Sequence, residues 1–207
     1  VLVGRAVVTQ VAQQGQFQVG ALIPTNGRYQ RANLELSLLG DLRYYRATYQ
    51  HQYFKPLFTT STLALNGEID YGRPFSGRPY PVFKNFYAGG IGSVRGYEGS
   101  SLSVTPVADV DVTGGNARLI LNAELQFPFP GTGVDRSLRW FTFVDAGNVF
   151  NTVAGEKISV GNLRASAGVG ISWVSPIGPL KLSFGKALNA KENDRTQPFQ
   201  FQLGTGF

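Results

Sequence analysis

The chain of 207 residues is predicted to be all-β, an antiparallel up-and-down transmembrane β-barrel of about ten strands. Apolar and polar residues alternate with a period of two through most of the sequence, which is typical of strands. The alternating segments run to ten or more residues, which suits tilted membrane strands better than those of a soluble sandwich. The second face of these segments carries Gly, Ser, Gln, Asn, Arg and Glu, as a wet barrel interior does, whereas a sandwich needs an apolar face to bury.

The composition agrees with this prediction and excludes several functions. Charged residues make up only 15% of the chain, against about a quarter in soluble domains, and no apolar run reaches the roughly 18 residues of a membrane helix. The absence of cysteine excludes disulfides and thiolate metal sites. The net charge is +6, but Lys and Arg occur singly, so we expect no nucleic-acid partner.

The front of the chain is expected to form four strands, at residues 3–13, 16–24, 28–39 and 42–54. The turn-forming sequences PTNG at 24–27 and GD at 40–41 separate the last three of them.

The middle strands are expected at 60–72 and 116–128, and the second shows the alternation most clearly. One face of the segment NARLILNAELQFPF is apolar and consists of Leu119, Leu121, Ala123, Leu125 and Phe127. The other face is polar and includes Arg118, Asn122, Glu124 and Gln126.

Four more strands are expected at 137–148, 163–174, 179–188 and 197–207. The turn sequences FPGTG at 129–133 and SPIGP at 175–179 precede two of them. In the last strand, Phe199, Phe201, Leu203 and Phe207 alternate with Gln200, Gln202, Gly204 and Gly206.

An even number of strands predicts that both chain ends lie on one side of the membrane. The short turns near 24–27, 55–59, 129–136 and 175–178 share that side, and the longer links 73–115, 151–162 and 189–196 lie on the other. Short periplasmic turns and long external loops are typical of bacterial outer-membrane barrels.

The segment 73–115 is the long external loop of this single domain, 1–207, and it contains the sequence FYAGGIGSVRGYEGS from Phe86 to Ser100. Five glycines surround one arginine, Arg95, in a loop flexible enough to fold back into a polar lumen. Alternation turns Glu124 and Asp145 of the following strands inward. Because a guanidinium inside a barrel is costly unless it is paired, we expect these carboxylates to be its partners.

No catalytic or metal site is expected. His51 is the only histidine, and the glycine-rich loop matches no phosphate-binding pattern. The acidic residues at 68, 70, 124 and 145 are interpreted as structural partners of arginines. We therefore expect a protein that is not an enzyme and needs no cofactor.

Several motifs in order along residues 28–207 resemble the C-terminal half of the barrel of the BamA family, the central subunits of the bacterial β-barrel assembly machinery. They are NFYAGGIGSVRGY, GGNARLILNAELQFPFP, FTFVDAGNVF, RASAGVGISWVSPIGPLKLSFGKAL and FQFQLGTGF. The resemblance implies a piece of a roughly sixteen-stranded barrel, without about six strands and without the family's periplasmic POTRA domains.

The resemblance also implies residue roles. The VRGY motif, Val94, Arg95, Gly96 and Tyr97, corresponds to a loop that folds into the lumen, where its arginine bonds to Glu124 and Asp145. The closing segment corresponds to the C-terminal β-signal, through Phe199, Phe201, Leu203, Gly204 and Phe207. In the family the last strand pairs weakly with the first as a lateral gate.

The function that the resemblance implies is assembly and insertion of outer-membrane proteins in a Gram-negative bacterium. Its partners are outer-membrane lipid, unfolded outer-membrane protein clients and, through the POTRA domains, assembly lipoproteins. Two alternatives remain open: a protein-translocating pore of the related two-partner secretion type, and a stable barrel fragment without activity.

Overall fold

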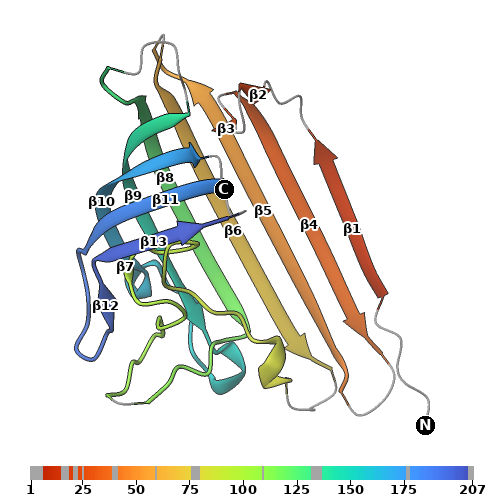
Figure 1. Ribbon diagram of the computed structural model, residues 1–207. Helices are drawn as coiled ribbons and strands as arrows, with labels where there is room; N and C mark the ends of the chain where they lie inside the picture. Colours follow the sequence, from red (N-terminus) through yellow and green to blue (C-terminus); the bar gives the residue numbers. More distant parts are fainter. Residues whose placement is uncertain are drawn as a thin grey trace.

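The computed structural model describes residues 7–14, 19–20, 23–24, 26–38, 42–58, 60–75, 80–108, 110–131, 137–175 and 178–204. Nine strands form one antiparallel sheet, in the order β1, β4, β5, β6, β8, β9, β10, β11, β13 (Figure 1). Their bounds are β1 Val7–Gln14, β4 Gly27–Ser37, β5 Tyr44–Pro56, β6 Thr62–Pro74, β8 Ala117–Pro128, β9 Leu138–Phe150, β10 Arg164–Ser175, β11 Gly178–Ala187 and β13 Phe199–Leu203.

The main sheet is strongly curved, as part of a barrel wall is. In Figure 1, β1, β4 and β5 form a flatter wing, and β10, β11 and β13 curl round to face it. Within the described part of the chain, β1 and β13 are the two ends of the sheet and do not pair with each other, so the barrel is open. A single curved sheet also shows that the sandwich alternative was wrong.

The described residues of the predicted strand at 16–24 do not join this sheet, and residues 16–18, 21 and 22 lie outside the described residues. Instead β2 (Val19–Gly20) and β3 (Ile23–Pro24) pair with each other as a separate ribbon, and β1 pairs directly with β4. With nine described strands in the sheet, β1 and β13 run in the same direction, so the start of β1 and the end of β13 lie on opposite sides, contrary to the prediction that the two ends share one side.

The predicted separation of short turns from long loops is confirmed. The strand ends that join β5 to β6, β8 to β9 and β10 to β11 lie at one rim of the sheet, and those that join β6 to β8, β9 to β10 and β11 to β13 lie at the other, together with the shorter connection from β4 to β5. We call these the short-turn rim and the long-loop rim.

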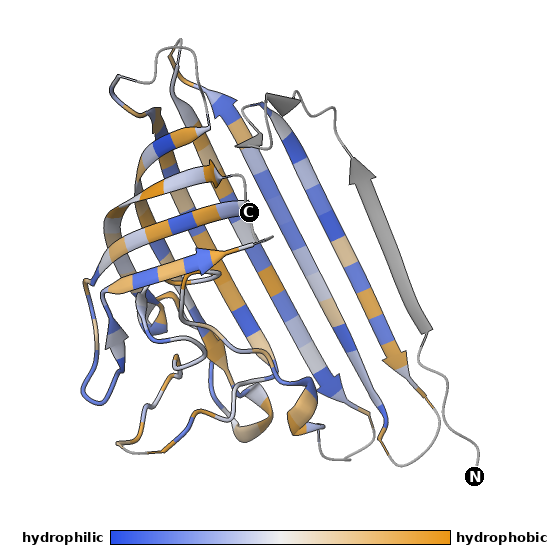
Figure 2. Cartoon of the chain, viewed as in Figure 1, coloured by the Kyte–Doolittle hydropathy of each residue, from blue (hydrophilic) through white to orange (hydrophobic). Residues whose placement is uncertain are grey.

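The predicted facing of the strands is also confirmed. Ile69, Leu121 and Val169 on the convex face are 57%, 46% and 51% exposed, whereas Glu124 and Arg164 on the concave face are buried. Figure 2 shows the resulting alternation of hydrophobic and hydrophilic residues along the strands. Two aromatic residues at strand ends, Tyr44 and Phe150, are buried.

The apolar core lies between the concave face and the long loop that covers part of it. It consists of Phe86, Ala88, Val94, Tyr97, Leu102, Ile120 and Val149. Among the described residues, no helix is long and apolar enough to cross a membrane.

Candidate functional site

The long loop between β6 and β8 lies on the concave face of the sheet (Figure 1). It starts with a 3-10 turn, η1 (Val82–Lys84), and it contains the two-residue strand β7 (Gly96–Tyr97). At its base, Phe86 and Gly115 exchange backbone hydrogen bonds of 2.7 and 3.0 Å. These two bonds close the base of the loop, while its tip reaches strands β8 and β9 on the concave face.

Arg95, at the tip of the loop, is bound by the two carboxylates that alternation turned inward. Its Nε and Nη2 donate to Oδ2 and Oδ1 of Asp145 at 2.7 and 2.8 Å, and its Nη1 donates to Oε2 of Glu124 at 2.6 Å. The backbone N–H of Arg95 also donates to Asp145, at 3.0 Å. One carboxylate thus fixes both the side chain and the backbone of the loop tip.

The cluster is buried and electrically balanced. Arg95, Glu124 and Asp145 are 4%, 7% and 0% exposed. A second cation, Lys181 of β11, donates to Oε2 of Glu124 at 2.9 Å, so two positive charges meet two negative ones. Burial lowers the pKa of Arg95, but hydrogen bonds and charges from Asp145 and Glu124 outweigh burial and leave that pKa raised. The guanidinium is therefore permanently charged.

Aromatic rings of β9 support the guanidinium from below. The Cζ atom of Arg95 lies 3.7 Å from the ring centroid of Phe143, a close cation–π contact. The ring of Phe143 lies over Gly168 of β10, where an added Cβ would lie 2.7 Å from the Cζ atom of Phe143. The missing side chain at Gly168 makes room for the ring.

Gly96 allows the backbone of the loop to touch β11. Its φ is +86°, which favours glycine, and an added Cβ would lie 3.1 Å from the carbonyl of Gly185. The two glycines face each other across the contact, so a side chain at either one pushes the loop tip away from the wall.

The other two motif residues pack into the apolar core. Val94 and Tyr97 are both fully buried. Burial raises the pKa of Tyr97 to about 12, so its phenol remains protonated, and it donates to the carbonyl of Ala165 at 3.3 Å. All four VRGY residues therefore contact the barrel wall.

The loop tip is also joined to the chain that enters the last strand. β7 pairs with β12 (Thr196–Gln197), and a single residue, Pro198, separates Gln197 from the start of β13. The Nε2 of Gln200, inside β13, donates to the backbone carbonyl of Tyr97 at 2.6 Å. A displacement of the motif thus breaks bonds to the strand at the open edge of the sheet.

Two further ion pairs seat the loops at the long-loop rim. Arg164 of β10 is fully buried and binds Asp194 with Nε and Nη2, while Nη2 also donates to the carbonyl of Ser103 at 3.1 Å. In the second pair, Lys84 of η1 donates to Oε1 of Glu35 in β4 at 2.6 Å.

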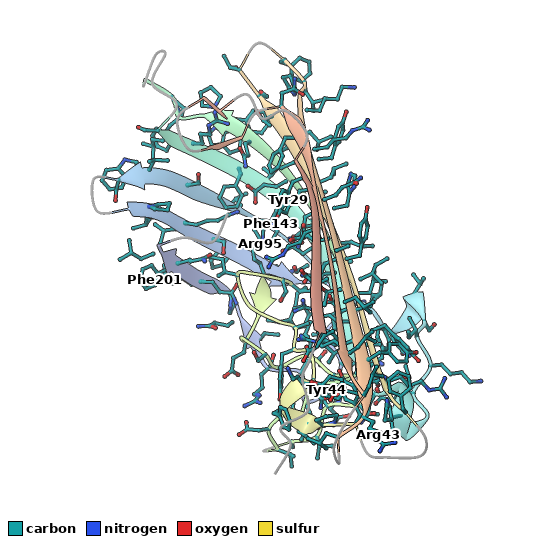
Figure 3. All side chains as sticks on the ribbon, turned by 90° about the vertical axis from the view of Figure 1, so that its right-hand side faces the viewer. Tyr29, Arg43, Tyr44, Arg95, Phe143 and Phe201 are labelled. Atoms are coloured by element: carbon teal, nitrogen blue, oxygen red, sulfur yellow. The ribbon has the colours of Figure 1, made fainter. Side chains whose placement is uncertain are left out.

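Figure 3 shows how the predicted site residues are divided between the two faces. Arg95 and Phe143 lie in the concave space between the wings, whereas Phe201 points away from it. Phe199, Phe201 and Leu203 of the predicted β-signal are 60%, 61% and 51% exposed on the convex face. Gly204 ends the strand with a φ of +102°, and Phe207 lies outside the described residues.

Sequence reasoning brought together Arg95, Glu124 and Asp145 but missed three supporting groups. Lys181 was missed although it alternates with Leu180 and Leu182 and so faces inward. Phe143 was missed because an aromatic residue on a polar face has no signal of its own. Gln200 was missed because its partner is a backbone carbonyl far along the chain.

The family is decided by comparison with known proteins. The family model of the Omp85 superfamily domain matches residues 20–207. The chain belongs to the Omp85 superfamily.

Relatives of this Omp85 chain include outer-membrane assembly factors. It is 39% identical to the outer membrane protein assembly factor BamA of Neisseria meningitidis, over 90% of this chain and 27% of that protein. It is 26% identical to a SAM50-like protein of Schizosaccharomyces pombe, over 90% of this chain and 41% of that protein. This Omp85 chain thus spans about a quarter of the length of the first relative.

A solved structure agrees with both the fold and the family. The crystal structure of BamA from Haemophilus ducreyi lacking POTRA domains 1-3 matches with a TM-score of 0.83 and 28% identity, over 95% of this chain and 41% of that one. The open sheet is therefore part of an Omp85 barrel, and this Omp85 chain is an outer-membrane protein.

Proposed function

We propose that this chain is the membrane-embedded, non-enzymatic part of a factor that assembles and inserts outer-membrane β-barrel proteins. The observation that carries the proposal is the Arg95 cluster, because it joins the long loop to β8 and β9 and, through β7, to the segment that leads into β13. The names of the BamA relatives support the same function.

The chemistry of the proposed function is strand addition rather than bond making. An edge strand presents unpaired N–H and C=O groups, to which an incoming client strand adds as a further strand. The loop anchored by Arg95 holds the last strand of this chain in position from inside the barrel. Clients of this factor are unfolded outer-membrane proteins, and its wider partners are assembly lipoproteins and the lipid of the outer membrane.

The function is tested by charge reversal in the full-length protein, reconstituted in liposomes with its assembly partners. Arg95→Glu places three carboxylates together, so the loop leaves its seat and folding of a barrel client slows by about tenfold or more. Adding Glu124→Arg restores opposite charges and part of the rate. The control is Arg195→Glu. Arg195 also pairs with a carboxylate, that of Glu98 in the long loop, but its side chain is 45% exposed.

A translocating pore is the alternative function, and the same assay distinguishes it. An assembly factor leaves its client protease-resistant in the membrane, whereas a pore releases its client on the far side. An unchanged folding rate in Arg95→Glu contradicts the proposed role of the loop.

A further inference from the structure

A groove of about 700 Å³ crosses the convex, lipid-facing side of the sheet from β4 to β9. Its floor contains the small residues Gly67, Ala123 and Ala146, and its walls include Leu121 and Val144. Across β6, β8 and β9, each large residue is paired with a small one on the neighbouring strand: Leu65 pairs with Ala123, and Leu121 pairs with Ala146. The groove is therefore built by the sequence of three strands rather than by one gap.

The floor at Gly67 is open by side-chain size alone. An added Cβ there has only Cδ2 of Leu121 within 4 Å, at 3.8 Å, and its φ is not in the left-handed region. A larger residue thus fits the backbone at this position. The glycine keeps the groove deep.

Polar side chains face the groove at one end, since the amides of Asn66 and Asn122, also in its lining, bond on the concave face. Arg28 and His51 line it there, and the Cζ atom of Arg28 lies 5.2 Å from the ring centroid of Tyr53. Among the residues that the structure describes, Arg28 has no ion pair. A guanidinium on the lipid face without a carboxylate suits an anion supplied by the membrane.

His51 adds a second hydrogen-bond donor beside Arg28. Its Nδ1 lies 3.0 Å from Nε2 of Gln30, which is a donor only, so Nδ1 accepts and Nε2 carries the proton. Arg28 pairs across the strands with Tyr53, and Gln30 with His51, so Arg28 and His51 are diagonal neighbours on one face. An anion between them receives bonds from both.

The polar end of the groove lies at a membrane boundary, and the apolar end lies deeper. Arg28 is the second residue of β4, counted from the short-turn rim, whereas Ala146 is more than half-way along β9, counted from the same rim. An acyl chain in the groove thus runs from the boundary into the hydrocarbon.

We propose that the groove binds one phospholipid, with its phosphate held by Arg28 and His51 and one acyl chain lying over Gly67. The charge of the phosphate complements the guanidinium of Arg28, and the chain fills the apolar floor. This site is separate from the Arg95 cluster, which lies on the opposite face, and it does not depend on the assembly function.

Photochemical labelling in lipid nanodiscs tests the proposal on the full-length protein. Two probes carry the same acyl-chain diazirine, one a phosphatidylethanolamine and the other a diacylglycerol without phosphate. We expect the phospholipid probe to label peptides of β6 and β8 about fivefold more than the diacylglycerol probe, as attraction of one cation to a lipid headgroup gives. Arg28→Gln combined with His51→Leu removes this difference.

Two variants separate the headgroup site from the chain groove. Gly67→Leu fills the floor and reduces labelling of these peptides by both probes, while heat-modifiable gel mobility shows that the barrel is folded. Lys55→Gln, on the same face and near the same rim but outside the lining, leaves labelling unchanged. Equal labelling of the wild-type protein by both probes overturns the proposal, because it means a general layer of lipid without headgroup recognition.

Discussion

Two regions of the sheet, the back (strands β8 and β9) and the front (strands β4 and β5), have the same alternating pattern. They differ in what covers their concave face. At the back, over β8 and β9, the loop tip covers the polar side chains, and Asp145 is fully buried against Arg95. At the front, on β4 and β5, the ion pair of Glu35 with Arg46 is 3.8 Å long, and its side chains are 16% and 29% exposed. The alternation of the sequence determines which face a side chain points to. Whether the long loop covers that side chain determines how much its ion pair contributes to stability.

The largest predicted effect comes from breaking the covered cluster. Arg95→Ala leaves Asp145 and Glu124 buried with reduced compensation and should cost about 3–5 kcal/mol of the free energy of unfolding. Lys181 remains beside Glu124, so Asp145 accounts for most of the loss. Urea unfolding of the refolded protein measures it. Arg195→Ala, the exposed control, should cost at most about 1 kcal/mol, and equal losses in the two variants contradict the comparison.

The next effect tests which face meets lipid. Leu121→Arg puts a charge on the convex face near the middle of the sheet and should cost about 2–4 kcal/mol. Asn122 faces the interior, but its Nδ2 donates to the carbonyl of Ser93 and to Asp145, so it helps to seat the loop. Gln52, on the interior face of β5, is therefore the sharper control. Gln52→Arg should be nearly neutral, and a cost equal to that of Leu121→Arg contradicts the assigned facing.

The sequence predicted the strands and their facing well because alternation is a local signal that every strand repeats. It also predicted Glu124 and Asp145 as partners of Arg95, since they are carboxylates turned inward on the strands that follow the loop. It did not predict the β7–β12 pairing or the bond from Gln200, because these join segments about a hundred residues apart. It did not predict the open edge, because alternation along a strand does not say whether the first and last strands pair. The strand expected at 16–24 was wrong for Val19–Gly20 and Ile23–Pro24, which pair with each other, because local alternation does not say which segment a strand pairs with.

A smaller effect is expected where the loop meets the last strand. Gln200→Leu removes one of two donors to the carbonyl of Tyr97, which keeps its bond from the backbone N–H of Gly90 at 3.0 Å, so the cost should be about 0.5–1.5 kcal/mol. Hydrogen exchange of the amides in β7 and β12 should increase in this variant. Gln202→Leu is the control on the same strand, and an equal increase there argues against a specific bond.

The smallest effect is expected at the front of the loop. Lys84 donates to Glu35 in a partly exposed pair, with side chains 28% and 16% exposed, so Lys84→Gln should cost less than about 1 kcal/mol. The same urea titration measures it. A loss as large as that of Arg95→Ala means that the front anchor, and not the covered cluster, holds the loop.

The central claim is that Arg95 holds the loop and the last strand as one unit. Hydrogen–deuterium exchange of the folded wild-type protein and of Arg95→Ala tests it most directly, with residues 86–102 and 196–203 followed as separate peptides. We expect both peptides to lose protection together in the variant, while β4 and β5 stay protected. Loss of protection in 86–102 with 196–203 unchanged contradicts the claim, because it shows a loop that leaves its seat without affecting the strand at the open edge.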